Sequence, residues 1–335
     1  MDLVNHLEGR LLFAVPKSKS PSNIHTNDSF PQRAARERER GHDAYAHGRL
    51  QQATLDLLAG CDVQFRRETR LDIALVKNLP IALIFLPAAD IPTFVGEGRV
   101  DLGITGRDQV AEHDATLPTG EASGVEEILD LGFGGCKLQV QVPEKGDITE
   151  ASQLVGRNVV TSFTALSEQF FAKLEGLEAG QKNLSTKIKY VGGSVEAACA
   201  LGVADGIVDL VESGETMKAA GLKAIDTVVT STAVLVKSRG SNTDLLNLLT
   251  SRIRGVITAQ KFVLCQYNIP RSELAVASKI TPGKRAPTIT ALEEENWVAV
   301  SSMVEKKRIA TVMDDLIKVG ATDILVLNIA NSRTD

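Results

Sequence analysis

Short apolar runs alternate with segments of helical spacing along the first part of the chain. Residues 11–15 are a continuous apolar run, the pattern of a strand buried on both faces of a parallel sheet. Residues 80–86 and 100–106 are further predicted strands. Residues 48–60 repeat apolar positions at helical spacing and stop at Gly60, which predicts a helix with a glycine C-cap. This alternation of strands and helices predicts an α/β fold.

A second set of strands and helices follows. Apolar runs at 137–143 and 206–211 enclose segments of helical spacing at 166–176 and 194–204. A further strand at 232–238 leads into a long amphipathic helix. Two similar α/β lobes in one chain predict a ligand site in the crevice between them, at the strand ends.

The pattern changes near residue 262 to strand, strand, helix and strand with polar outer faces. Residues 281–290 between the first two strands read as a loop. The order predicts a small α+β sandwich of the ferredoxin type. We therefore predict lobe I from residues 1–134 and 228–250, lobe II from 135–227, and a C-terminal domain from 251–335.

Composition narrows the possible functions. The 335 residues include 37 Lys and Arg against 42 Asp and Glu, a net charge of −5, so no overall basic surface suits a dedicated nucleic-acid binder. No apolar run approaches the ~20 residues of a membrane span, and the start lacks the order of a signal peptide. We expect a cytoplasmic protein without nucleic-acid or membrane partners.

Cysteine and histidine offer little material for catalysis. The four cysteines are scattered singly, which indicates neither a disulfide framework nor a structural zinc site. Three of the five histidines lie in the polar segment 18–47. Because a Ser/His or Cys/His site needs a histidine base, we expect the chemistry to come from carboxylates, backbone amides and a metal bound to substrate.

The strongest candidate site follows the apolar run 206–211. The next residues, Glu212 to Thr216, precede a helix-forming segment, so backbone N–H groups at a helix N-terminus would face an anion. Gly214 lets the backbone approach a phosphate closely, while Ser213, Glu215 and Thr216 complete the loop. A capping box without any ligand explains the same spacing equally well.

Three carboxylates near this loop are further candidates. Asp209 and Glu212 suit ribose hydroxyls or a substrate-bound Mg²⁺. Glu196 falls in the first turn of another predicted helix, where spacing alone favours a simple cap. Thr105 and Arg107 belong to the glycine-rich turn at 100–108, which either faces the crevice with its unpaired amides or is an ordinary β-α loop.

Together these motifs resemble the long form of ATP phosphoribosyltransferase, in its fungal style, the first enzyme of histidine biosynthesis. The most specific match is VEAACALG-x-AD-x-IVDLVESGETM at 195–217, combined with the LGITG turn at 102–106. Further matching segments are RLLFAVPK, GRL, KLQVQVPEKG, VTSFTALSEQFFAKLEG, ITPGKRAPTIT, WVAVSSMVEKK and GATDILV. They span nearly all of the chain outside residues 18–47.

The resemblance implies two periplasmic-binding-protein-like lobes around a catalytic cleft and a Mg²⁺-assisted reaction. N1 of the adenine of ATP displaces pyrophosphate from C1 of phosphoribosyl pyrophosphate and yields phosphoribosyl-ATP. The loop Glu212 to Thr216 would hold the 5-phosphate, and Asp209 and Glu196 would contact ribose hydroxyls. The implied site also includes Lys17 and Arg49, a cleft wall of Asp101, Leu102, Gly103 and Thr105, and Asp209 and Glu212 as metal contacts through substrate.

The C-terminal domain resembles the regulatory domain of the long form, whose members bind histidine as a feedback inhibitor and assemble from dimers into hexamers. Asn268, Lys284 and Thr288 fall at the family's histidine contacts, and Asn268 replaces an acidic residue of some bacterial members. The alternative is a non-catalytic two-lobed binding protein or regulatory subunit. Phosphoribosyl-ATP formation by the purified chain alone separates the two.

One departure from the family concerns the turn P-K-K-G-R-L. Here thirty residues, 18–47, separate Pro16 and Lys17 from Gly48, Arg49 and Leu50. The segment is polar and carries the block RAARERERG, a composition that does not order itself. It is either a tolerated surface excursion, since doubling a loop costs only about 0.6 kcal/mol, or a gene-model artefact such as a translated intron.

Deleting residues 18–47 tests the effect of this segment. We expect the shortened chain to have a lower KM for phosphoribosyl pyrophosphate, because the deletion restores the turn that joins Lys17 to Arg49. Steady-state kinetics of both chains measure this difference. Equal activity would show that the segment does not impair the site.

Overall fold

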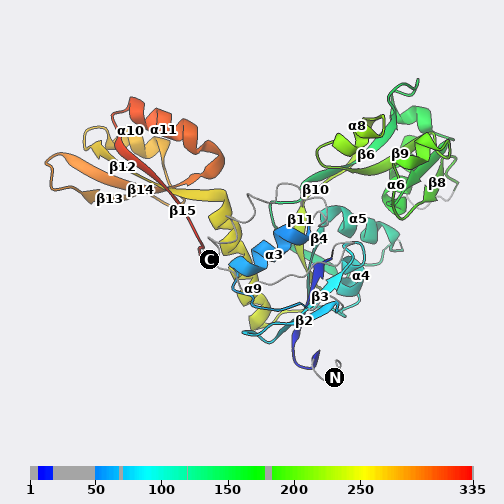
Figure 1. Ribbon diagram of the computed structural model, residues 1–335, viewed down its shortest axis with the longest axis horizontal. Coiled ribbons are helices and arrows are strands. Elements are labelled where there is room, and N and C mark those ends of the chain that lie inside the picture. The colour runs from blue at the N-terminus through cyan, green and yellow to red at the C-terminus, as the bar shows by residue number, and fades with distance from the viewer. Residues whose placement is uncertain (1–6, 18–49, 68–70, 119, 178–182, 334–335) are drawn as a thin grey trace. The chain divides into compact units, whose positions relative to one another are not determined.

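The computed structural model describes residues 7–17, 50–67, 71–118, 120–177 and 183–333, which form two compact units (Figure 1). The first unit reaches residue 242 but leaves out residues 57–62, which belong with residues 243–333 in the second. The predicted insertion 18–47 and Arg49 lie outside the described residues.

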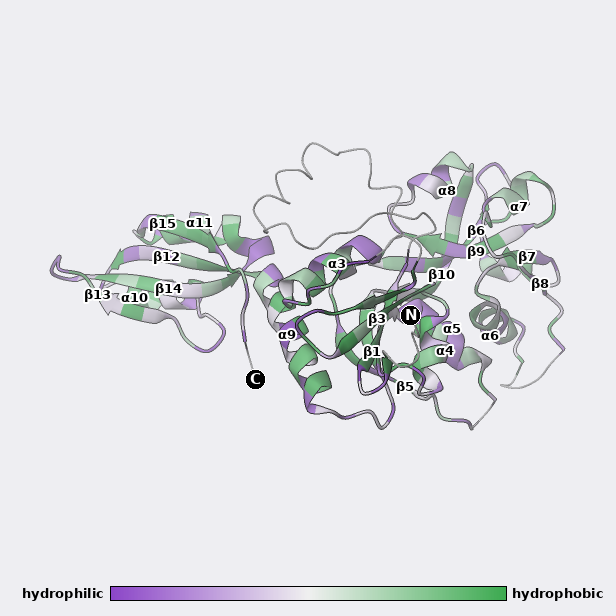
Figure 2. Ribbon diagram, turned by 60° about the horizontal axis from the view of Figure 1, so that its bottom comes forward, coloured by the Kyte–Doolittle hydropathy of each residue, from purple (hydrophilic) through white to green (hydrophobic). Residues whose placement is uncertain are grey.

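The first sheet of the first unit is built around strand β1. Its order is β2 (Ile73–Leu75), β3 (Ile81–Leu86), β1 (Leu11–Pro16), β4 (Leu102–Gly106), β11 (Ala233–Ser238) and β5 (Val125–Asp130). β1 pairs in parallel with β3 and β4, as its apolar run predicts. Figure 2 shows β1 and β3 in the colour of hydrophobic residues. β11 pairs antiparallel with β4 and β5, so the chain returns to this sheet after building the next one.

Two helices follow the strands of this sheet. α4 (Ile91–Gly96) has a proline in its first turn, and α5 (Arg107–Thr116) begins directly after β4. α4 packs so closely on β4 that a Cβ at Gly103 would lie 2.7 Å from Cγ2 of Ile91. The glycine therefore allows the helix to approach the strand.

The second sheet is also mixed. Its order is β10 (Leu222–Ser231), β6 (Cys136–Pro143), β9 (Gly206–Val211), β7 (Asn158–Thr161) and β8 (Lys187–Tyr190). Its helical segments are η2 (Ala151–Leu154), α6 (Thr164–Leu174), α7 (Ala197–Ala200) and α8 (Glu215–Ala219). The predicted helix at 194–204 shrinks to the four residues of α7, because Gly202 takes a left-handed φ of 66° and ends it.

The second unit is ferredoxin-like, as predicted, but it has one helix, α10, and one strand, β13, more than the predicted order of strand, strand, helix and strand. Its sheet runs β13 (Thr288–Ala291), β14 (Trp297–Glu305), β12 (Phe262–Pro270) and β15 (Thr322–Asn328), with antiparallel neighbours throughout. Its helical segments are α9 (Asp244–Lys261), α10 (Leu274–Ile280), η3 (Lys306–Arg308) and α11 (Ile309–Lys318). The prediction of a loop over 281–290 is wrong in part, because β13 begins inside it; its four residues are all exposed and give no apolar signal.

The glycine cap predicted for the first helix is also wrong. α3 (Gln51–Gly60) includes Gly60, and the left-handed residue is Asp62, with φ of 56°. Gly60 serves packing instead, since a Cβ there would lie 3.0 Å from Cγ1 of Val256 on α9. The pattern predicted the end of the helix correctly, but Gly60 contributes close packing and not a C-cap.

Helix α5 links the two sheets of the first unit through Glu112. Its two carboxylate oxygens accept hydrogen bonds from the backbone N–H groups of Ala165 and Leu166 at 2.8 and 2.9 Å. These are first-turn N–H groups of α6, which have no partner within their own helix. On the same helix, Ala111 and Ala115 pack against the apolar core of the second sheet.

A second link lies where the chain passes from β10 to β11. The fully buried carboxylate of Asp108 on α5 accepts a hydrogen bond from the hydroxyl of Ser231, which in turn accepts from the backbone N–H of Asp108 at 2.9 Å. The guanidinium of the neighbouring Arg107 donates hydrogen bonds to Thr232, Glu127 and Asp130. The crossing strand is therefore fixed to the start of α5.

Within the part of the chain that the structure describes, no helix is both long enough and apolar enough to cross a membrane.

Replacing Glu112 by Gln tests the link between α5 and α6. The amide keeps one accepting oxygen but loses the charge, so we expect the free energy of unfolding to fall by about 1–2 kcal/mol. Chemical denaturation measures it. Glu168→Gln on the exposed face of α6 is the matched control and should change the stability by under about 0.5 kcal/mol. Equal stabilities for both variants would contradict the assignment.

Candidate active site

The loop after β9 leads into α8 through a left-handed glycine. Gly214 is the residue before the first turn of α8 and has φ of 79°, a conformation that suits glycine. Gly214 has no side chain to cap this turn, and the Glu215 N–H donates to the Ser213 hydroxyl at 3.4 Å. The alternative of a capping box is therefore wrong, because the cap position holds a residue without a side chain.

Asp209 lies on β9 in a half-buried position. Its Oδ1 accepts a hydrogen bond from the backbone N–H of Leu210 at 2.8 Å. Burial raises the pKa of this carboxyl to about 6; the Leu210 N–H opposes the rise, and the negative charge of Glu196 adds to it. The structure therefore brings Asp209 within electrostatic reach of Glu196, which lies in the loop after β8.

Glu196 is positioned by the residues before it. Val195 is buried in an apolar cluster with Val160 and Ile207, while Ser194 takes an unusual φ of 51°. Glu196 itself precedes α7, yet its side chain makes no capping hydrogen bond there. Glu196 therefore takes the cap position that its spacing favoured, but without a hydrogen bond from its side chain.

One edge of the second sheet gathers these groups. β7 pairs in parallel with β8 and β9, so the loops that follow all three strands meet at the same edge. The loop after β7 starts α6, whose first-turn amides are already bound by Glu112. The loops after β8 and β9 carry Glu196 and residues 212–216.

The residues predicted on the opposite lobe mostly build the strand β4. Leu102 and Thr105 are fully buried, and the Thr105 hydroxyl donates to the carbonyl of Ala88 at 2.7 Å. Asp101 accepts from the backbone N–H of Leu12 at 2.8 Å, which ties β4 to β1. Gly103 lies under α4, as described above. Contact between this group and a ligand stays a prediction.

Lys17 lies at the carboxyl end of β1, with a second cation nearby. Its Nζ is 2.8 Å from Oδ2 of Asp72, and Arg67 reaches the other oxygen of Asp72 at 3.3 Å. The Arg67 guanidinium also lies 4.0 Å from the centre of the Phe85 ring. Burial lowers the pKa of Arg67, against the effect of Asp72. Arg67 was missed by sequence reasoning, although the Arg66-Arg67 pair was a signal.

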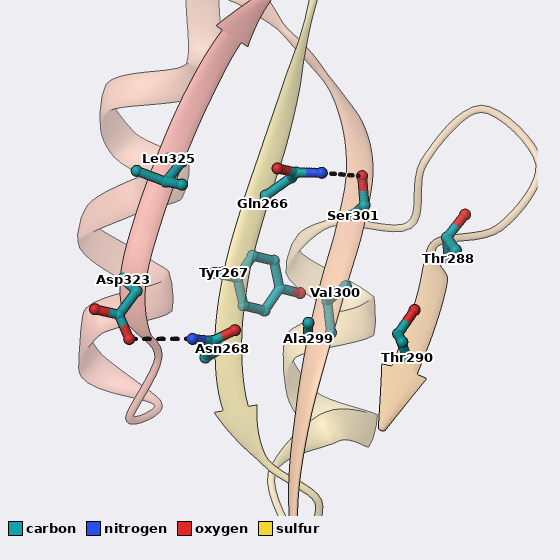
Figure 3. A pocket seen from close by; sticks show the side chains of 10 residues that line it. All are labelled: Gln266, Tyr267, Asn268, Thr288, Thr290, Ala299, Val300, Ser301, Asp323 and Leu325. Carbon is teal, nitrogen blue, oxygen red and sulfur yellow. Dashed lines mark hydrogen bonds between the residues drawn. The ribbon is translucent and has the colours of Figure 1, made fainter. Parts of the chain in front are cut away.

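Two of the three predicted effector residues, Asn268 and Thr288, lie on the sheet of the second unit. Asn268 and Thr288 line a pocket on the face of this sheet that the helices leave open (Figure 3). Lys284 is exposed in the connection before β13 and does not line that pocket. The structure therefore places two of the three predicted residues together.

Comparison with known sequences decides the family. The sequence profile described as ATP phosphoribosyltransferase matches residues 87–255, and that of the HisG C-terminal domain matches residues 259–331. An ATP phosphoribosyltransferase of Yarrowia lipolytica is 55% identical over 99% of this chain and 100% of that protein, and one of Saccharomyces cerevisiae is 50% identical with the same coverage.

The chain belongs to the ATP phosphoribosyltransferase family. The predicted family and activity, a pentosyltransferase acting in histidine biosynthesis, are thereby confirmed. An ATP phosphoribosyl transferase (HisG:HisZ) complex from Thermotoga maritima aligns with a TM-score of 0.54 and 20% identity, over 75% of this chain and 98% of that one. This likeness supports the predicted fold class. The exact boundaries of the predicted lobes and C-terminal domain stay predictions.

The carboxylates fit one particular mode of metal binding. Among the described residues of this phosphoribosyltransferase, no three His, Cys, Asp or Glu side chains gather around a common point. Mg²⁺ is commonly held by one or two carboxylates together with substrate phosphates and water. Asp209 and Glu212 suit that arrangement.

The raised pKa of Asp209 predicts a pH-dependent stability. The pKa of Asp209 is about 3.9 in the unfolded chain and about 6 in the folded chain. Between about pH 3.9 and about pH 6, the folded chain therefore binds more protons at this site than the unfolded chain. The contribution of Asp209 to stability therefore falls as pH rises through this range. Asp209→Asn cannot ionise, so we expect it to be about 1–2 kcal/mol more stable than the unchanged chain at pH 7.5, with a smaller gain at pH 4.5.

Urea denaturation at both pH values measures this difference. Asp226→Asn is the matched control, because Asp226 also accepts from the next backbone N–H, at 2.7 Å, but is exposed. We expect no pH-dependent gain there. A gain for Asp209→Asn that is the same at both pH values would contradict the burial argument.

Proposed function

We propose that the edge of the second sheet, with Asp209, Glu196 and the loop 212–216, binds phosphoribosyl pyrophosphate for attack by ATP. In this reaction a bond forms between adenine N1 and C1 of the ribose while the bond from C1 to pyrophosphate breaks. The products are phosphoribosyl-ATP and pyrophosphate. The electrostatic proximity of Asp209, on β9, and Glu196, in the loop after β8, is the observation that carries this assignment.

The loop 212–216 would hold the 5-phosphate. The left-handed Gly214 turns the backbone into α8, so that first-turn amides lead toward the phosphate, and Ser213 and Thr216 add hydroxyl donors. Glu215 lies within the first turn of α8. This arrangement suits a displacement at an anomeric carbon, which needs positioned phosphates more than a protein nucleophile.

Asp209 and Glu196 would accept hydrogen bonds from the ribose hydroxyls. A bound sugar hydroxyl donates to a carboxylate and offsets part of the electrostatic cost that raises the pKa of Asp209. Asp209 and Glu212 would hold Mg²⁺ together with substrate oxygens. The metal would neutralise part of the negative charge on the leaving pyrophosphate.

The first lobe would supply cations. Lys17, at the end of β1, and Arg49, which lies outside the described residues, would bind phosphate oxygens of the substrates. The Lys17 ammonium is partly exposed and shares Asp72 with Arg67, so a phosphate can compete for both cations. Asp101, Leu102, Gly103 and Thr105 would form the wall of the cleft on this side.

The second unit would regulate the enzyme by binding histidine. Asn268 and Thr288 in its pocket support this role, and Lys284 would approach from the connection before β13. We also propose a cytoplasmic enzyme that assembles from dimers into hexamers. A feedback inhibitor on a separate unit must act by favouring one of two global states.

Kinetics of single variants test the substrate site. With purified chain, ATP, phosphoribosyl pyrophosphate and Mg²⁺, chromatography of phosphoribosyl-ATP gives the rate. We expect Asp209→Asn and Glu196→Gln to lower kcat/KM by about 100-fold, or about 2.7 kcal/mol. Thr216→Ala should raise the KM for phosphoribosyl pyrophosphate about tenfold, because it removes one hydroxyl donor.

Thr116→Ala is the control for the threonine variant. Its hydroxyl is exposed and donates to the carbonyl of His113 at the end of α5, away from these loops. It should keep the unchanged KM. Unchanged kinetics in Asp209→Asn, Glu196→Gln and Thr216→Ala would refute the assigned site. No product from the unchanged chain would favour a non-catalytic binding subunit.

A further inference from the structure

The pocket of the second unit lies on the open face of its sheet. Alternate residues of β12 and β14, such as Tyr267 and Val300, are buried in the core that α10 and α11 complete. Gln266, Asn268 and Ser301 alternate with them and therefore face away from the helices (Figure 3). Gln266, Asn268 and Ser301 thus line the pocket from the face opposite the core.

A β-bulge in β15 changes the face of one residue. Gln266 pairs with Leu325 and Asn268 pairs with Thr322, so β15 has two residues, 323 and 324, where β12 has only Tyr267. Asp323 takes a left-handed φ of 53°, a conformation that aspartate tolerates better than most residues. Asp323, one of the two residues of β15 opposite Tyr267, is therefore the residue that takes the left-handed conformation.

The bulge directs Asp323 to the pocket and keeps Ile324 in the core. Regular alternation from Thr322 would turn Asp323 toward the apolar core. Instead Ile324 packs against the core, while Asp323 lines the pocket beside Asn268. Bulges that re-aim a side chain are frequent at functional sites, which makes this carboxylate a candidate for recognition.

The hydrogen bonds leave one oxygen of Asp323 for a ligand. Oδ2 accepts from Nδ2 of Asn268 and from the hydroxyl of Thr322, each at 3.1 Å. Oδ1 has no hydrogen-bond partner among the described residues. The other polar side chains of the lining are neutral amides and hydroxyls: Gln266, Asn268, Thr288, Thr290 and Ser301. Asp323 is therefore the charged group of this lining and gives the pocket a preference for a cationic ligand group.

We propose that Asp323 binds the α-ammonium group of the effector amino acid, and so determines that the pocket takes an amino acid. This inference rests on the proposed regulation by histidine and names the group that recognises it. At pH 8 the imidazole ring, with an ordinary pKa near 6.5, is mostly neutral, whereas the ammonium group keeps its charge. The charge-assisted bond to a carboxylate is stronger than a neutral one.

Calorimetric titration of the full chain at pH 8 tests the proposal with two ligands. L-histidine carries the ammonium group, and imidazolepropionate lacks it. We expect imidazolepropionate to bind the unchanged chain at least tenfold more weakly. Asp323→Asn keeps the side-chain size, tolerates the left-handed backbone and removes the charge. It should raise the Kd of histidine at least tenfold and leave the Kd of imidazolepropionate unchanged.

Asp315→Asn on α11 is the matched control, because Asp315 pairs with exposed Lys318 on the helical side of the unit. It should keep the histidine Kd. Histidine binding that Asp323→Asn does not weaken would overturn the inference while leaving the regulatory proposal in place. Equal losses for both ligands would overturn the assignment to the ammonium group. No histidine binding by the unchanged chain would refute the regulatory proposal itself.

Discussion

The parallel pairing of β7 with β8 and β9 decides which side chains the second sheet brings together. Because parallel strands end at the same edge, the loops after β8 and β9 meet there although they are far apart in sequence. Glu196 and Asp209 are held near each other at this edge, and burial together with their mutual repulsion raises the pKa of Asp209. Such an unfavourable arrangement persists because the surrounding sheet fixes both groups, and it is typical of binding and catalytic sites.

Helix α5 determines which loops at that edge remain available to a ligand. Glu112 binds the first-turn amides of α6, so the longest helix beginning at this edge already holds an anionic group of the chain itself. The loop before α8 has no such internal carboxylate at its cap position, which is Gly214. The same helix holds Ser231 through Asp108, where the chain returns to the first sheet. One helix therefore joins the lobes and leaves the loop 212–216 as the candidate phosphate site.

The apolar pattern predicted strands with a continuous apolar run, such as β1, and strands with regular alternation, such as β12 and β14. It missed β5 and β13, which have at most one buried residue each. β1 and β3 were evident as continuous apolar runs, whereas β5 exposes Glu126 and Glu127 and was not predicted. Sequence motifs found Asp209 and Glu196, but their mutual approach depends on strand pairing between distant segments. Arg67 was not predicted because it is a candidate only through its contact with Asp72, which Lys17 also contacts. The spacing of residues along the chain does not reveal that contact.

Both candidate sites contain residues with a left-handed backbone conformation. Ser194 near Glu196, Gly214 in the loop 212–216 and Asp323 in the pocket all take left-handed φ values, of 51°, 79° and 53°. For the two residues other than glycine, this conformation costs free energy that the surrounding structure must supply. In β15 the apolar run DILVLN resembles any buried strand, because a sequence does not show where one strand gains a residue against its neighbour. The bulge resolves a conflict between two demands on one strand: Ile324 completes the core, and Asp323 reaches the opposite face.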